Sequence, residues 1–151
     1  MRSSSGIPIS WVLVGELALG PAPVADRHLD KLAAEGIEAV FSLCSEAEAP
    51  PPEAMAERFR VRRLVLPDHR VGLLEPEQLG QALAILGELH AEGPVFVHCV
   101  AAIERSPLLC LGWLIRQHGL SQQQALDYLM QVHPGTNPLG HQLAVLAQLC
   151  G

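Results

Sequence analysis

The sequence has few charged residues and no excess of basic ones. Of its 151 residues, 17% are charged and 49% are hydrophobic, and ten Lys and Arg face sixteen Asp and Glu, which gives a formal net charge of −6. A chain this apolar is expected to fold, so disorder is excluded as its main state. Nucleic-acid-binding proteins usually carry a basic face, and the acidic balance therefore argues against a nucleic-acid partner.

Long hydrophobic runs and targeting signals are also lacking. No apolar run approaches the length of about 20 residues that a membrane-spanning helix needs, and the N-terminus lacks the basic-then-apolar pattern of a secretion signal. We therefore expect a soluble, cytoplasmic protein with no membrane partner. The Ser-rich start, residues 1–6, is expected to be flexible, and residues 7–151 are expected to form a single domain.

The cysteines and histidines show no spacing typical of a disulfide framework or a metal site. The four cysteines lie far apart, at positions 44, 99, 110 and 150, with no CxxC pair, and the seven histidines form no HExxH pattern. Neither a metal nor an organic cofactor is predicted. In a cytosolic chain, a cysteine in an unusual setting is more often catalytic than bridged.

Short apolar segments alternate with segments of helical period, which predicts an α/β fold. We expect a central, mostly parallel sheet of four to five strands flanked by helices. The expected strands are residues 11–14, 16–19, 38–44, 60–66 and 95–98, and the expected helices are residues 26–35, 53–58, 75–92, 105–117, 122–132 and 138–149.

The segment that follows the last strand has an unusual combination of residues. Cys99 and Arg105 are separated by five residues, but Cys110 and Arg116 have the same spacing inside a predicted helix, where the backbone amides are already used. Cys99 differs because it ends an apolar strand and precedes a loop that leads into a helix. Such a loop leaves amide N–H groups unpaired, which suits a phosphate, and the guanidinium of Arg105 can bind two phosphate oxygens at once.

This setting predicts a specific reaction. The field of the helix N-terminus and of Arg105 favours the thiolate form of Cys99. The expected chemistry is attack of the Cys99 sulfur on phosphorus, which gives a cysteinyl-phosphate that water then hydrolyses. The leaving oxygen needs a proton, so a general acid should lie on another loop.

The segment HCVAAIERS resembles the His-Cys-x5-Arg-Ser/Thr signature of the cysteine-dependent protein phosphatases. The chain is similar in particular to the small dual-specificity (tyrosine/serine/threonine) type. The similarity extends to LALGPAP, to GIEAVFSLCSE, to the loop around Asp68 and to GLSQQQALDYLMQVHPGTNP. It implies the fold of that family and a phosphorylated protein or peptide as the substrate, with a phosphate or sulfate ion expected to bind in the loop.

The resemblance also implies roles for individual residues. Cys99 would be the nucleophile, Ser106 would assist breakdown of the phospho-enzyme, and Asp68, which lies 31 residues before Cys99, would be the general acid and then the base. Some related phosphatases protect the nucleophile with a second cysteine, which here would be Cys44. His98 is expected to make hydrogen bonds behind the site. The phosphate would be bound by Arg105 and by the loop residues Val100, Ala101, Ala102, Ile103 and Glu104.

Two residues depart from the family pattern and leave alternatives open. Ala102 stands where the family usually has glycine, and it would be strained there if the position needs a positive φ. Glu104 places an acid beside Arg105. One alternative is therefore a phosphate-binding module with little or no turnover. Another is a phosphatase for phosphoinositides, inositol phosphates or RNA 5′-phosphates, but residues 100–104 hold none of the Lys or Arg that such substrates favour. If Asp68 proves inert, Glu75 and Glu77 are the substitutes to test.

Overall fold

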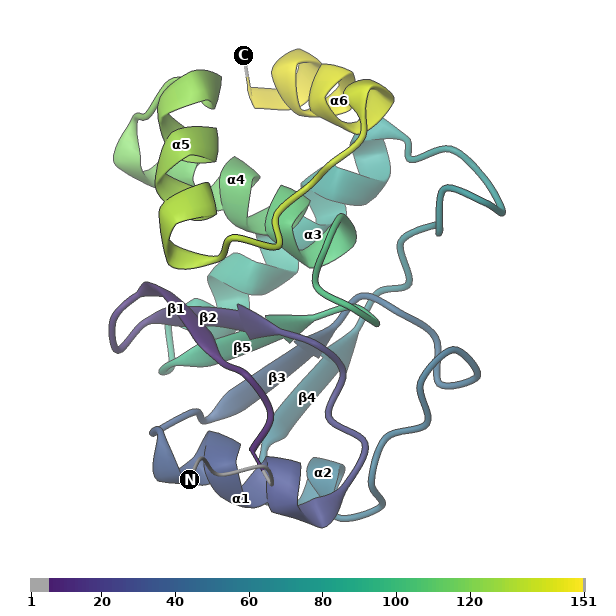
Figure 1. Cartoon of the computed structure of the whole chain (residues 1–151), viewed down its shortest axis with the longest axis vertical. Helices are drawn as coiled ribbons and strands as arrows, with labels where there is room; N and C mark the ends of the chain where they lie inside the picture. The colour runs from purple at the N-terminus through teal and green to yellow at the C-terminus, as the bar shows by residue number, and fades with distance from the viewer. Residues whose placement is uncertain (1–5, 151) are drawn as a thin grey trace.

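A five-stranded sheet forms the middle layer of the protein in the computed structural model, which describes residues 6–150 (Figure 1). Of the expected flexible start, only Gly6 is among these residues. The strand order is β1-β2-β5-β3-β4, with β1 antiparallel to β2 and the other neighbours parallel. The predicted mostly parallel sheet is thus confirmed. The strands are β1 (Ser10–Leu13), β2 (Leu17–Gly20), β3 (Ala39–Ser42), β4 (Arg60–Arg63) and β5 (Val95–His98).

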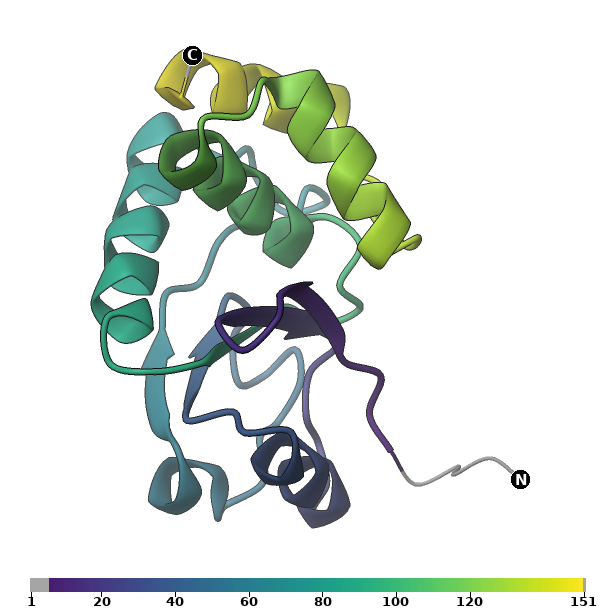
Figure 2. The same cartoon turned by 90° about the vertical axis from the view of Figure 1, so that its left-hand side faces the viewer.

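Helices cover both faces of the sheet (Figures 1 and 2). The first face carries α1 (Asp26–Ala34) and α2 (Met55–Arg58). The second carries α3 (Pro76–His90), α4 (Arg105–His118), α5 (Gln122–Val132) and α6 (Gly140–Cys150). Within residues 6–150, none of these helices has the length and apolar character needed to cross a membrane.

Strand β5 shows why the sequence of the central strands is so apolar. Val95, Phe96 and Val97 are all 0% exposed. Phe96 packs in the core beneath α1 and α2, whereas Val95 and Val97 pack in the larger core beneath the other four helices. A parallel strand that is covered on both faces requires apolar side chains at successive positions.

The ends of the helices follow from local chemistry. Ser121 Oγ accepts the Gln124 amide at 3.1 Å and Gln124 Oε1 accepts the Ser121 amide at 2.9 Å, which is a capping box at the start of α5. Pro76 is the first residue of α3, where its missing N–H costs nothing. Helix α4 ends at His118 and is capped by Gly119, whose φ of 67° glycine adopts without strain.

Strand β4 lies at one edge of the sheet and is the most basic strand. It was predicted to extend to residue 66, but it ends at Arg63, because its only neighbour, β3, ends at Ser42. Arg62 Nη1 lies 2.9 Å from Glu88 Oε1 on α3. The exposed side of this edge therefore carries charge rather than an apolar surface.

Two glycines offer a matched test of the packing. An Ala at position 20 would place its Cβ 2.5 Å from the Pro8 carbonyl oxygen, whereas one at position 80 would lie 3.7 Å from Leu149 Cδ1. We expect Gly20→Ala to lower the free energy of unfolding by about 1–3 kcal/mol, because backbone cannot move aside easily. Gly80→Ala should raise it by about 1 kcal/mol through helix propensity. Urea unfolding measures both, and equal effects would contradict this account.

Candidate active site

Three loops meet at the carboxyl ends of β3, β4 and β5, the edge where parallel strands commonly place their sites. The loops after β4 and β5 line a pocket of about 270 Å³. The 99–105 loop follows β5 and forms most of the pocket wall, while Asp68 belongs to the loop that follows β4. The lining residues are Asp68, His69, Arg70, Cys99, Val100, Ala101, Ile103, Glu104 and Arg105.

The carbonyl groups of Val100, Ala102 and Ile103 in the 99–105 loop have hydrogen-bond partners outside the pocket. Since all peptides are trans, a carbonyl that points away from the pocket leaves the following N–H pointing toward it. Among the described residues, no amide of residues 100–104 donates a hydrogen bond. Val100 O accepts the Ala22 amide at 3.1 Å, Ala102 O accepts His133 Nε2 at 2.7 Å, and Ile103 O accepts the Asn137 amide at 2.8 Å.

Ala102 adopts the positive φ at which an alanine is strained and the family's usual glycine is not. Its φ is 59°, in the left-handed region that costs an L-residue about 1–2 kcal/mol. Its side chain is 1% exposed and packs in the core. We expected Ala102 to contact the phosphate, but its side chain does not line the pocket, because the loop turns the methyl group inward beneath it.

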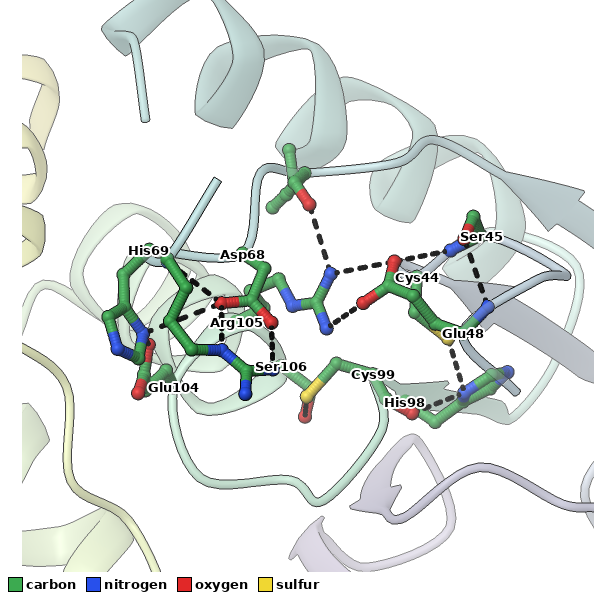
Figure 3. Close-up of polar contacts among 12 residues, drawn as sticks. Cys44, Ser45, Glu48, Asp68, His69, His98, Cys99, Glu104, Arg105 and Ser106 are labelled. Carbon is green, nitrogen blue, oxygen red and sulfur yellow. Dashed lines mark hydrogen bonds and ion pairs between the residues drawn. The ribbon is translucent and has the colours of Figure 1, made fainter. Parts of the chain in front are cut away.

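Cys99 and Ser106 face each other at the base of the pocket. Cys99 is 3% exposed, and its Sγ lies 3.3 Å from Ser106 Oγ (Figure 3). Ser106 is buried as the second residue of α4. The hydroxyl is therefore placed to donate a hydrogen bond to the sulfur.

His98 lies behind the pocket, where the sequence predicted a hydrogen-bonding role. Its Nδ1 is 2.9 Å from the Cys99 carbonyl oxygen and its Nε2 is 2.6 Å from Ser42 Oγ. Burial lowers the pKa of His98 to about 4, so the ring is neutral at neutral pH. A neutral ring that donates from Nδ1 and accepts the Ser42 hydroxyl ties the Cys99 backbone to β3.

Arg105 is held by a carboxylate that the sequence analysis did not identify. Glu48 Oε1 lies 2.8 Å from Nη2 and Glu48 Oε2 lies 3.3 Å from Nη1, while Nη1 also donates to the Leu66 carbonyl at 3.1 Å (Figure 3). These contacts leave Nε–H and one Nη2 hydrogen without a partner among residues 6–150, so one edge of the guanidinium can still bind an anion. The bonds from Arg105 lower the pKa of Glu48. The only signal for Glu48 was its place in an acidic loop that follows a strand.

Asp68 lies at the pocket but is bound by its neighbour Arg70. Arg70 Nη2 is 2.7 Å from Oδ2, Arg70 Nε is 3.1 Å from Oδ1, and the Arg70 amide is 2.9 Å from Oδ1. These hydrogen bonds hold the pKa of Asp68 well below its ordinary range, so it is an anion in this state. Glu75 and Glu77 do not line the pocket, and Glu75 is the N-cap residue of α3, where its amide donates to Gln78 Oε1 at 2.8 Å.

Glu104 stands at the rim of the pocket with its charge engaged. Its Oε1 lies 2.9 Å from His69 Nδ1 (Figure 3) and 3.2 Å from Gln142 Nε2. Both partners draw the carboxylate toward the loop that follows β4 and toward α6. The acid beside Arg105 therefore faces two donors as well as the pocket.

Cys44 comes directly after β3, the strand that pairs with β5. It is 0% exposed, and its Sγ lies 3.9 Å from His98 Nδ1. Burial raises the pKa of its thiol. Ser42 pairs with His98 in the sheet, so the residues that follow these two strands, including Cys44 and Cys99, emerge at the same edge.

Comparison with known proteins identifies the family. Residues 17–149 match the family described as the dual specificity phosphatase catalytic domain. The chain belongs to this family, which confirms the resemblance to dual-specificity phosphatases identified in the sequence. Dual specificity protein phosphatase 1 of Homo sapiens is 28% identical over 116 residues, which cover 76% of this chain but 30% of that protein.

Solved structures agree with the family assignment. The crystal structure of Tk-PTP in its active form has a TM-score of 0.81 and 28% sequence identity, and the match covers 93% of this chain and 95% of that one. The structure of PTPMT1 in complex with PI(5)P has a TM-score of 0.77 at 20% identity and covers 89% of each chain. The second similarity concerns the fold alone.

The Asp68–Arg70 contact predicts a measurable change in acidity. Arg70→Ala removes the two side-chain hydrogen bonds to the carboxylate and keeps the one from the backbone amide, so the pKa of Asp68 should rise part of the way toward its ordinary value of about 3.9. Carboxyl carbon NMR over a pH titration measures this. Arg58→Ala is the control, because it removes a similar exposed ion pair, which joins Arg58 on α2 to Asp30 on α1 at 2.8 Å. An unchanged Asp68 titration in Arg70→Ala would contradict the assignment.

Proposed function

We propose that this chain is a phosphatase that hydrolyses phosphotyrosine, and phosphoserine or phosphothreonine, in proteins through a cysteinyl-phosphate intermediate. The observation that carries the proposal is the 99–105 loop, whose outward-bonded carbonyls leave its amides facing Cys99. Membership of the dual specificity phosphatase family supports the same activity. We also propose that residues 7–151 form a single phosphatase domain.

In the first step the Cys99 thiolate attacks phosphorus, an S–P bond forms and the bond from phosphorus to the leaving oxygen breaks. The loop amides and the free edge of Arg105 bind the phosphoryl oxygens, which carry the charge of the transition state. Asp68 gives its proton to the leaving oxygen. Because Arg70 lines the same pocket, the substrate dianion competes with Asp68 for its guanidinium and so allows the carboxyl to hold a proton.

In the second step water attacks phosphorus and the S–P bond breaks. Asp68, now a carboxylate, takes a proton from the water. The Ser106 hydroxyl donates a hydrogen bond to the departing sulfur, for which its distance of 3.3 Å from Cys99 Sγ is suitable. Inorganic phosphate leaves and Cys99 is restored as the thiolate.

The pocket favours a substrate with a single phosphate. Apart from Arg105, its basic side chains are Arg70 and His69, and each contacts a carboxylate, at 2.7 Å and 2.9 Å respectively. Within residues 6–150, no other cation lines the pocket to bind a second phosphate. This supports a protein phosphomonoester over inositol phosphates, phosphoinositides or RNA ends.

A second candidate is a phosphate-binding module with little turnover. Two observations favour it: Asp68 is held as an anion by Arg70, and the Glu104 carboxylate lines the pocket. Both would slow catalysis more than they would prevent binding. Activity of the wild-type protein separates this candidate from the first.

A matched pair of cysteine variants tests the nucleophile. Cys99→Ala should lower kcat for an aryl phosphate by at least about 1,000-fold, because no other group forms the covalent intermediate. Cys110 has the same spacing to Arg116, but it is 0% exposed within α4, so Cys110→Ala should keep activity. Steady-state kinetics measures both. A wild type that binds a phosphopeptide without hydrolysing it would instead support the binding module.

The leaving group tests the proton donor. Asp68→Asn should lower kcat/KM for phenyl phosphate by about 100-fold, because phenoxide needs a proton, and much less for p-nitrophenyl phosphate. Glu75→Gln and Glu77→Gln are the controls and should leave both substrates unaffected, since neither residue lines the pocket. Equal losses on the two substrates would exclude Asp68 as the acid.

We further propose that Cys44 protects Cys99 as a reversible disulfide when peroxide oxidises the nucleophile. Peroxide first converts the Cys99 thiolate to a sulfenic acid, and the Cys44 thiol then displaces water to form the bond. The position of Cys44 after β3, next to β5, supports this. Peptide mapping after peroxide should recover a 44–99 disulfide, and activity should return with a thiol reductant. Cys99 sulfinate with no bridge would end the idea.

A further inference from the structure

His133, at the end of α5, makes two hydrogen bonds that connect distant parts of the fold. Its Nε2 lies 2.7 Å from the Ala102 carbonyl oxygen, and its Nδ1 lies 2.8 Å from Ser10 Oγ on β1. A carbonyl oxygen can only accept, so Nε2 carries the proton and Nδ1 of the neutral ring accepts the Ser10 hydroxyl. The ring therefore spans the space between β1 and the 99–105 loop in one defined orientation.

The group that His133 holds is the least relaxed part of the loop. Ala102 has a φ of 59°, and such a conformation persists only where its surroundings fix it. The chain beyond His133 supports the same side of the loop: the Asn137 amide donates to the Ile103 carbonyl at 2.8 Å, and the Thr136 hydroxyl donates to the His133 carbonyl at 2.8 Å. Thr136 is 4% exposed, so this support is buried.

The direction of the Ala102 carbonyl decides the direction of one pocket amide. In a trans peptide the C=O and the next N–H point in opposite directions, so drawing Ala102 O toward His133 turns the Ile103 N–H the other way. Ile103 lines the pocket, and its amide donates to no group among residues 6–150. We propose that His133 is a positioning residue for oxyanion binding, which it serves by directing the Ile103 amide into the pocket. The inference rests on the proposed function of the 99–105 loop.

The amides of glutamine and asparagine separate the two hydrogen bonds of the ring. A Gln side chain can place its Nε2 where His133 Nε2 lies and can still donate to Ala102 O. An Asn side chain reaches only as far as Nδ1, so it can accept from Ser10 but cannot reach Ala102. His133→Gln should therefore keep oxyanion binding, whereas His133→Asn should lose it. If His133 only joined α5 to β1, His133→Gln would lose more stability than His133→Asn, and neither variant would change oxyanion binding in its own right.

The experiment measures the dissociation constant of tungstate by calorimetry for the wild type, His133→Gln, His133→Asn and Ser10→Ala, with urea unfolding as the measure of stability. We expect His133→Asn to weaken binding about tenfold or more, as for the loss of one hydrogen bond to a charged group. His133→Gln and Ser10→Ala should stay within about threefold of the wild type. The order of the variants by tungstate affinity should differ from their order by loss of stability.

The outcomes distinguish the two proposals. Equal tungstate affinity in the wild type, His133→Gln and His133→Asn would overturn the role of His133 and leave the phosphatase assignment standing. Weaker tungstate binding in both variants, in proportion to their loss of stability, would also overturn the role of His133. A wild type that binds neither tungstate nor inorganic phosphate would instead overturn the proposed function of the loop.

Discussion

The anion binding that we propose depends on three carbonyl oxygens of the 99–105 loop, those of Val100, Ala102 and Ile103, which find their hydrogen-bond partners elsewhere. A short loop has as many acceptors as donors, and an anion is repelled by the acceptors. Here the acceptors bind the amides of Ala22 and Asn137 and the ring of His133. The partners come from the segment after β2 and from the segment between α5 and α6, so the anion site depends on the assembled fold.

The same edge of the sheet also sets the charges around the pocket. Loops after β3, β4 and β5 bring Glu48, Asp68 and Arg105 together although they are far apart in sequence. Each charged side chain has an opposite partner before any substrate arrives. Glu48 leaves one edge of the Arg105 guanidinium open, whereas Arg70 binds both carboxylate oxygens of Asp68. In the free protein, Arg105 is therefore open to the anion that we propose, whereas Asp68 is held as a carboxylate with no proton to donate.

The sequence predicted the fold and the centre of the site because both depend on local patterns. The apolar run of β5, the small residues after Cys99 and the start of α4 at Arg105 are adjacent in the chain, and the structure places them as expected. The partners of these residues could not be predicted in this way. Glu48 lies 57 residues from Arg105, and His69 lies 35 from Glu104. Contacts at such separations depend on loop conformations that no periodicity encodes.

Strand β4 illustrates how charge protects an exposed sheet edge. Edge strands present unpaired backbone groups on which another chain could add a further strand. Three of the four residues of β4 are arginines, at positions 60, 62 and 63, and Arg62 is tethered to α3 through Glu88. A second copy approaching along this edge would bring its own arginines against these, at a cost in repulsion and desolvation. The composition of this strand therefore opposes edge-to-edge association and aggregation of the sheet.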